Sequence, residues 1–320
     1  MTDTPNHLLS AFGATGQFFR GNLHCHSTAS DGALSPEEVC RRYREQGYDF
    51  ICLSDHFWKD YDFPITDTTA FRTNSFTTIL GAEVHTPAMS TGDLWHILAV
   101  GLPADFAPTP PDETGPELAD RCRAAGAFVA IAHPQWYGLT VEDAQSIGSA
   151  HAIEVYNHAS EVSTARGDGA YLLDLLLNAG RTIDAIACDD AHFAMPGDPN
   201  QDAFGGWVMV KATANQPDLL LEALKRGDYY SSQGPVIEAI RLEGDELIVE
   251  CGEPCDIIAV GYGYRTQRVP GTGHLAGRLP LGTFKDGWVR VVVRNAAGRR
   301  AWTNPMWRSA PGAQLVANSF

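Results

Sequence analysis

Basic residues are scarce in this sequence, which has 23 lysines and arginines against 39 acidic residues and a net charge of −16. A protein that binds duplex nucleic acid over a broad surface is normally basic, so we exclude duplex nucleic acid as a partner. A small anionic substrate remains compatible with this charge. Bound divalent ions would each add two positive charges at the place where such a substrate binds.

Long apolar segments are also absent, and no stretch approaches the roughly 20 apolar residues that a membrane-spanning helix needs. Residues 1–16 are polar and do not show the basic start and apolar run of a secretory signal peptide. The seven cysteines are odd in number and scattered, which favours buried, reduced thiols over a disulfide framework. These features predict a cytoplasmic protein without membrane association.

Short apolar runs alternate with helical patterns between residues 21 and 232. The run from Phe50 to Ser54, for example, is typical of a strand that is buried on both faces of an α/β core. Alternating strands and helices indicate a mostly parallel α/β fold. The strand–helix unit recurs about seven times rather than eight, so we predict a distorted (β/α)7 barrel.

The pattern changes after residue 232. Residues 233–320 contain short β-rich runs separated by glycine and proline turns, and they show no helical pattern. This pattern predicts a small C-terminal domain that resembles a β-sandwich. Residues 1–20 are expected to be an N-terminal lead-in. No motif in the C-terminal part indicates a ligand, so we expect it to pack against the barrel and shape the site.

The most informative stretch is His24-Cys25-His26, which Asp31 and Gly32 follow within one short loop. If this stretch is a strand, both histidines point to the same face, because side chains along a strand alternate. Two imidazoles on one face at the end of a strand provide half of a metal site. Asp31 adds a carboxylate, and Gly32 allows the chain to turn sharply.

Imidazole and carboxylate side chains recur where further strands are expected to end. In parallel barrels, the carboxyl ends of the strands carry the chemistry. A set of imidazoles and carboxylates without thiolates suits Mn²⁺, Fe²⁺ or Zn²⁺, and this set is too large for one ion. We therefore predict a cluster of two to three divalent metal ions. The candidate ligands are His24, His26, Asp31, His56, Glu83, His96, His133, Asp190 and His192.

These motifs resemble those of the polymerase and histidinol phosphatase (PHP) superfamily of metal-dependent phosphoesterases. The resemblance covers roughly residues 20–230. It rests on five motifs in order: His24-x-His26 with Ser30-Asp31-Gly32, Ser54-Asp55-His56, Gly81-Ala82-Glu83 with His96, His133-Pro134, and Asp190-Ala191-His192. The short connection before His133 and the β-rich C-terminal part look more like the branch that includes carbaryl-hydrolase-like metallohydrolases.

The resemblance implies three metal positions. The first would use His24, His26, Glu83 and Asp190. The second would share Glu83 and add His96 and His133. The third would use Asp31, His56 and His192. Asp55 and Asp189 are neighbours of these ligands, and we expect them to orient other groups or to stabilise turns.

The implied activity is hydrolysis of small organophosphate mono- or diesters, with nucleotides and oligonucleotide ends among the candidates. A hydroxide that bridges the metals would be the nucleophile. His158 and His85 are candidate proton donors to the leaving group. Arg166 and Lys59 are candidate cations for the phosphate.

Two alternative functions are also compatible with the sequence. The same metal site could hydrolyse an ester, carbamate or amide, since the ligands serve both reactions. Alternatively, the chain could be a non-catalytic PHP module in which the metals are structural and the β-rich domain binds a partner.

Overall fold

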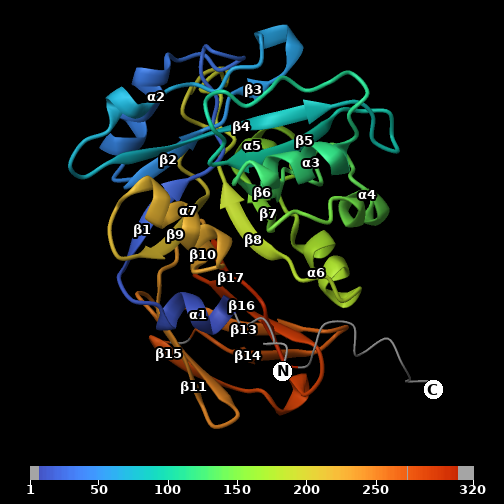
Figure 1. Cartoon of the computed structure of the whole chain (residues 1–320). Coiled ribbons are helices and arrows are strands. Elements are labelled where there is room, and N and C mark those ends of the chain that lie inside the picture. The colour runs from blue at the N-terminus through green and yellow to red at the C-terminus, as the bar shows by residue number, and fades with distance from the viewer. Residues whose placement is uncertain (1–6, 272, 309–320) are drawn as a thin grey trace.

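Strands from the first part of the chain form a distorted barrel, as the sequence predicts (Figure 1). The computed structural model describes residues 7–271 and 273–308. Residues 1–6 of the expected lead-in, and residues 272 and 309–320 of the expected C-terminal domain, therefore lie outside the described residues. Hydrogen bonds join the barrel strands in the order β1-β2-β4-β5-β6-β7-β8. The strands are β1 (Gln17–Asn22), β2 (Phe50–Leu53), β4 (Thr77–Thr86), β5 (Trp95–Val100), β6 (Phe128–Ile131), β7 (Ala152–Asn157) and β8 (Asp184–Cys188).

The barrel closes through a single bridge rather than through a full pair of strands. Cys25, just after β1, forms this parallel bridge with Ala191, just after β8. Strand β1 was expected to run to His26, but it ends at Asn22. Beyond Asn22 the segment lies between the ends of β2 and β8: the Ser54 amide donates to the Cys25 carbonyl, and the His26 amide donates to the Ala191 carbonyl. The expected lead-in boundary at residue 20 falls inside β1.

One strand of the barrel runs against its neighbours. Strands β1, β2 and β4 are parallel, as are β6, β7 and β8, whereas β5 is antiparallel to both β4 and β6. The connection between β4 and β5 spans residues 87–94, and a parallel crossover needs a dozen or more residues. The short connection therefore forces a hairpin. The mostly parallel barrel is confirmed, and β5 is part of its distortion.

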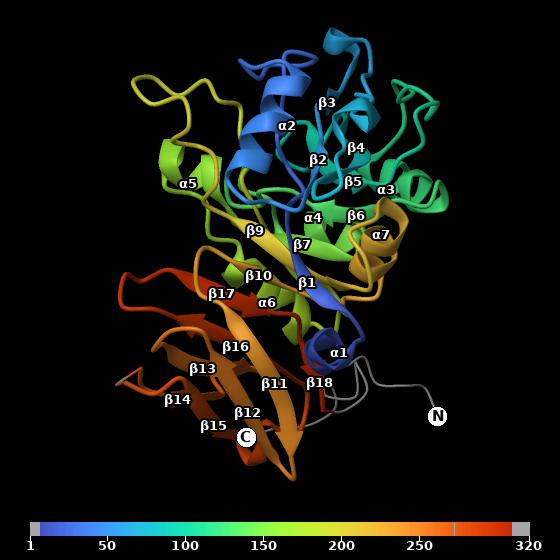
Figure 2. The same ribbon diagram turned by 90° about the vertical axis from the view of Figure 1, so that its left-hand side faces the viewer.

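Most of the helices lie around the barrel, whereas the first lies against the C-terminal part of the chain (Figures 1 and 2). Their starts follow ordinary capping chemistry: the Ser35 hydroxyl accepts from the Glu38 amide, and Thr114 and Glu117 form a capping box. No helix among the described residues has the length and apolarity required to cross a membrane. The helices are α1 (His7–Gly13), α2 (Pro36–Glu45), α3 (Gly115–Ala124), α4 (Val141–Ser146), α5 (His158–Thr164), α6 (Ala170–Asn178) and α7 (Pro217–Lys225).

The C-terminal part is a β-sandwich whose larger sheet continues the sheet of the barrel (Figure 2). Strand β9 pairs with β1, β10 pairs with β9, and β17 pairs with β10. The larger sheet contains β9 (Trp207–Ala212), β10 (Tyr229–Ser232), β17 (Arg300–Thr303), β16 (Trp288–Arg294), β13 (Asp256–Gly261) and β14 (Thr266–Val269), with β18 (Met306–Trp307) paired to β16. The smaller sheet contains β11 (Ile237–Glu243), β12 (Glu246–Cys251) and β15 (Ala276–Pro280).

Trp302 joins the two parts of the chain, which gives a first prediction. Its ring lies on β17, is 1% exposed and stacks on Tyr156 of β7 with the ring centroids 6.0 Å apart. We expect Trp302→Ala to lower the free energy of unfolding by about 3–5 kcal/mol, since it leaves a cavity in a shared core. Urea unfolding measures this. The control Tyr264→Ala, at a side chain that is 95% exposed, should stay within about 0.5 kcal/mol. An equally small effect at Trp302 would mean that the two parts fold independently.

Candidate metal centre

The segments after β1 and β8 bring the first ligands to the same end of the barrel. The amide of His26 donates to the carbonyl of Ala191, and the amide of Asp190 donates to the carbonyl of His24, both at 2.8 Å. These two hydrogen bonds hold the segments side by side. The rings of His24 and His26 therefore lie together, with centroids 5.2 Å apart, although the segment is not a regular strand.

Glu83 of β4 lies at the centre of the cluster and is fully buried. Its Oε1 atom lies 2.9 Å from Nδ1 of His96 and 2.9 Å from Nε2 of His133. Its Oε2 atom lies 3.5 Å from Nε2 of His24 and 2.7 Å from Nδ1 of His56. Burial opposes the ionisation of Glu83, but the charges of the surrounding imidazoles hold its pKa well below the usual range. Glu83 is thus a carboxylate, which is the form that binds cations.

Asp190 supplies a second buried carboxylate. Its Oδ1 atom lies 3.1 Å from Nε2 of His24 and 2.9 Å from Nε2 of His26. Asp190 has a φ of 59°, a left-handed conformation that is uncommon outside glycine. The backbone must turn sharply here to aim the carboxylate at the two histidines, and such strained positions concentrate at functional sites.

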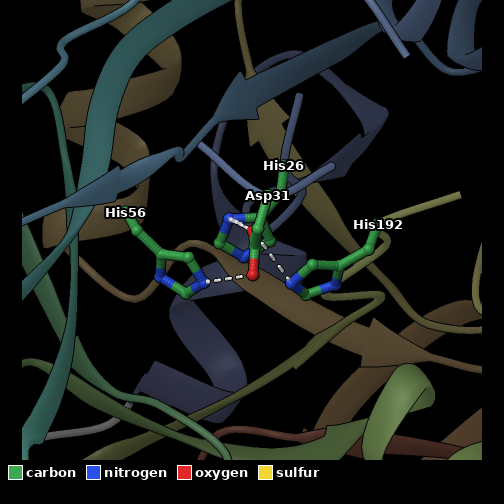
Figure 3. Close-up of side chains that lie close together, drawn as sticks. All are labelled: His26, Asp31, His56 and His192. Carbon is green, nitrogen blue, oxygen red and sulfur yellow. Dashed lines mark ion pairs between the residues drawn. The ribbon is translucent and has the colours of Figure 1, made fainter. Parts of the chain in front are cut away.

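A third group of side chains lies at the more open end of the cluster, where Figure 3 shows His26, Asp31, His56 and His192 pointing toward one another. The Asp31 carboxylate lies 3.3 Å from Nε2 of His56 and 3.4 Å from Nε2 of His192. A Cβ at Gly32 would lie 2.6 Å from the His26 backbone, so only glycine fits the turn that places Asp31. The structure thus brings all nine predicted ligands together.

The unpaired atoms of this cluster test whether it fits metal ions. Nε2 of His24, Nδ1 of His26 and Oε2 of Glu83 are buried and have no hydrogen-bond partner. Leaving such an atom unsatisfied costs roughly 1–3 kcal/mol. Ligand atoms around a tetrahedral zinc ion lie about 3.3 Å apart, and the ion pairs between imidazole nitrogens and carboxylate oxygens of this cluster span 2.7 to 4.0 Å. The donor set and its spacing fit divalent ions.

The protonation of the imidazoles also bears on metal binding. Burial, together with the neighbouring His56 and His192, lowers the pKa of His26 to about 4, so this imidazole is neutral and can ligate. Burial lowers the pKa of His56, but Glu83 and Asp31 outweigh that effect and raise it to about 10. An ion that binds to His56 must therefore displace a proton.

Glu154 of β7 is a functional residue that the sequence analysis did not identify. Its Oε1 atom lies 2.7 Å from Nδ1 of His24, and its Oε2 atom accepts from the backbone amide of His133 at 2.7 Å and from Asn157 at 2.8 Å. The carboxylate thus fixes the His24 ring with Nε2 toward the cluster. A signal was present, since Glu154 is the one charged residue in the apolar run from Ala152 to Tyr156.

Asp55 and Asp189 hold the loops that carry the ligands, as expected. The Asp55 carboxylate accepts hydrogen bonds from Ser27, Ser30 and Thr66, and so fixes the loop that leads to Asp31. Asp189 accepts from the Tyr43 hydroxyl at 2.8 Å and from the backbone amides of residues 204–206. Burial raises the pKa of Asp189 to about 6, despite these hydrogen bonds.

His158 does not reach the cluster, so the structure does not support it as the proton donor. Asn157 caps α5 by accepting from the Ser160 amide, and His158 becomes the first residue of that helix. Its Nδ1 atom lies 2.8 Å from the Tyr156 hydroxyl, and its ring packs so closely against Gly205 that a Cβ there would lie 2.2 Å away. Among the described residues, the lining of the central cavity does not include His158.

Arg166 lies at the mouth of the site rather than inside it. Its guanidinium donates to the Trp136 carbonyl at 3.3 Å, and it shares a surface hollow with His96 and Trp136. The central cavity has a volume of about 270 Å³ and is lined by ligand residues together with Trp136, Ser160 and Met195. Trp136 is 42% exposed and borders both spaces. Lys59 is the other candidate cation for the phosphate, and its ammonium lies 5.3 Å from the ring of Trp58.

Comparisons with known proteins agree with this geometry. The model of the family described as PHP domain matches residues 22–160. A stretch of 35 residues, 11% of this chain, is 57% identical to a 5'-3' exoribonuclease of Haemophilus influenzae, and the match spans 13% of that protein.

A solved structure from Bacteroides vulgatus, described as a two-domain protein that contains a predicted PHP-like metal-dependent phosphoesterase, shares the fold. It is 17% identical, the alignment covers 92% of this chain and 93% of that one, and the TM-score is 0.54. An amidohydrolase from Chromobacterium violaceum is 16% identical over 55% of this chain and 88% of its own, with a TM-score of 0.40.

Proposed function

Because this chain carries a PHP domain, we propose that it hydrolyses small organophosphate mono- or diesters with the help of two to three divalent ions of manganese, iron or zinc. One observation supports the proposal most directly: nine imidazole and carboxylate side chains lie together at one end of the barrel, and seven of them line a cavity of about 270 Å³. The similarity of one segment to an exoribonuclease supports nucleotides or oligonucleotide ends as candidate substrates.

The divalent ions, when bound, would polarise the phosphoryl group and acidify a water molecule. The protein's part is to hold the ligands in place. Glu83 offers its two oxygens to different histidines, so it would be shared between ion positions. Glu154 orients His24, and Asp55 fixes the loop of Asp31. The substrate would enter beside Asp31 and His192, because their side chains are 39% and 26% exposed.

Arg166 and Trp136 would act at the mouth. A guanidinium can pair with phosphate oxygens, and Arg166 lies beside the hollow that contains His96. The exposed ring of Trp136 offers a flat apolar surface to the organic part of the ester. Both groups are placed to bind the part of the substrate that lies outside the metal cluster.

A second candidate function is hydrolysis of an ester, carbamate or amide at the same cluster. It is favoured by the short connection between β5 and β6, residues 101–127, which holds one helix and no cap over the site. An open mouth admits organic groups that carry no phosphate. A third candidate is a non-catalytic domain in which the metals are structural and the cavity catalyses no reaction.

One set of assays separates these functions. We expect the Mn²⁺-loaded protein to release p-nitrophenol from p-nitrophenyl phosphate or bis(p-nitrophenyl) phosphate, and to act at least tenfold more slowly on p-nitrophenyl acetate and an aryl carbamate. Asp31→Asn should abolish most of the phosphate activity, whereas Asp105→Asn, at an exposed position away from the cluster, should not. Faster hydrolysis of the acetate or carbamate would favour the second function, and no hydrolysis of any substrate would favour the third.

A further inference from the structure

His85 lies beside the cluster but is not one of the nine predicted ligands. It belongs to β4, two residues after Glu83, and is 3% exposed. Its Nδ1 atom lies 3.0 Å from the backbone carbonyl of Trp95 on the neighbouring strand β5. A carbonyl oxygen can only accept, so Nδ1 of His85 carries the hydrogen in this contact. In the neutral imidazole, Nε2 is then left as an acceptor.

That acceptor faces His56. Nε2 of His85 and Nδ1 of His56 lie 2.8 Å apart and form a hydrogen bond. Since His85 accepts, His56 donates from Nδ1. Oε2 of Glu83 is equally close to Nδ1 of His56, at 2.7 Å, yet this oxygen has no hydrogen-bond partner. The hydrogen of His56 is therefore directed at His85, and the Glu83 oxygen stays free for an ion.

The other nitrogen of His56 faces the third group of ligands. Nε2 of His56 lies 3.3 Å from the Asp31 carboxylate, on the side where His192 also lies. A ligating histidine usually donates its second ring hydrogen to a neighbouring group, which fixes both the tautomer and the orientation of the ring. His24 has the buried carboxylate of Glu154 for this purpose. His56 has the imidazole of His85 instead.

We propose that His85 is a positioning residue that fixes His56, through the chain from the Trp95 carbonyl to His85 to His56, as the ligand of a third ion held with Asp31 and His192. This inference rests on the proposed metal-dependent function. A neutral imidazole polarises its donor less than a carboxylate does, and Asp31 and His192 are partly exposed. The third ion is accordingly the most weakly held of the cluster and the first to leave on dialysis.

Two substitutions of His85 test this role, with metal content per chain as the readout. In His85→Leu no acceptor remains for His56, and we expect the affinity for one ion to fall about 10–100-fold. In His85→Gln the amide oxygen can accept from Nδ1 of His56, and we expect the affinity to stay within about threefold of the wild type. His151→Gln, at a histidine that contacts Phe128 at the other end of β6, is the matched control. Elemental analysis after titration with Mn²⁺ and dialysis gives the ion count.

A double variant separates positioning from direct ligation. Asp31→Ala alone should lose the third ion, and Asp31→Ala with His85→Leu should lose no further ion. The proposal is overturned if His85→Leu binds metal like the wild type, if His85→Gln loses as much as His85→Leu, or if the double variant loses an additional ion. Thermal unfolding of each variant shows that it is folded. Absence of metal from the wild type after loading would instead contradict the proposed function itself.

Discussion

Glu83→Gln is expected to lower the hydrolysis of an aryl phosphate by about 10³-fold. Glu83 lies within 3.7 Å of five of the predicted ligand histidines, so its negative charge acts on the largest part of the cluster. Lewis-acid polarisation by bound ions contributes several kcal/mol to such a reaction. Each 1.36 kcal/mol corresponds to a tenfold change in rate. The amide keeps the size of the side chain and removes the charge that holds the ions.

Steady-state kinetics with saturating Mn²⁺ measure this effect. Glu222→Gln is a suitable control, since that side chain is 59% exposed and pairs with Lys225 on the surface of α7. The control should retain wild-type kcat/KM. A Glu83→Gln variant with more than a tenth of wild-type activity would show that this carboxylate is not shared between essential ions.

Removal of the metals is expected to lower the free energy of unfolding by about 4 kcal/mol, relative to protein held at a thousand times the Kd of the ions. Metal removal should destabilise the fold because the ligand atoms are buried. His24, His26 and Glu83 are fully buried and keep unpaired atoms, which bound cations would satisfy. Ions that bind the folded chain and not the unfolded chain therefore stabilise the fold.

Urea unfolding with added Mn²⁺ and with a chelator compares the two states. The Glu83→Gln variant provides the control, because a chain that no longer holds the ions should unfold at the same urea concentration in both conditions. Identical unfolding curves for the wild type with and without metal would contradict the fit between the cluster and divalent ions.

The sequence predicted the barrel because its strands are short apolar runs that alternate with helical patterns, and this order leaves few arrangements. The run from Phe50 to Ser54 is an example, and it forms β2 as expected. It did not predict α4 and α5, which are short and depend on single capping residues such as Asn157. The end of β1 at Asn22 was also missed, because a contact with the segment around Ala191, far away in the sequence, redirects the chain.

The C-terminal domain was predicted as a separate unit, and its sandwich is confirmed. The continuity of its larger sheet with the barrel was not foreseen. Strand pairing between β10 and β17 joins residues about 70 positions apart, for example Ser231 and Trp302. The residues near either strand do not indicate which distant strand it pairs with or in what register.

The nine candidate ligands could be picked out from the sequence because short motifs that contain them recur in or beside the strands. The supporting residues were not, since their roles depend on hydrogen bonds between distant positions. Glu154 reaches His24 across 130 positions, and His85 reaches His56 across 29. His158 was expected in the site, but Asn157 caps α5 and the His158 ring lies against Tyr156 and Gly205, a placement that the sequence alone does not indicate.

The chemistry proposed for this protein depends on a cluster of divalent ions held by the converging histidines and carboxylates. Elemental analysis of the purified protein, with the wild type beside Glu83→Ala, tests it most directly. We expect two to three ions of manganese, iron or zinc per wild-type chain and the loss of most of them in the variant. A wild-type chain that stays free of metal after loading, or a variant that binds as much metal as the wild type, would contradict it.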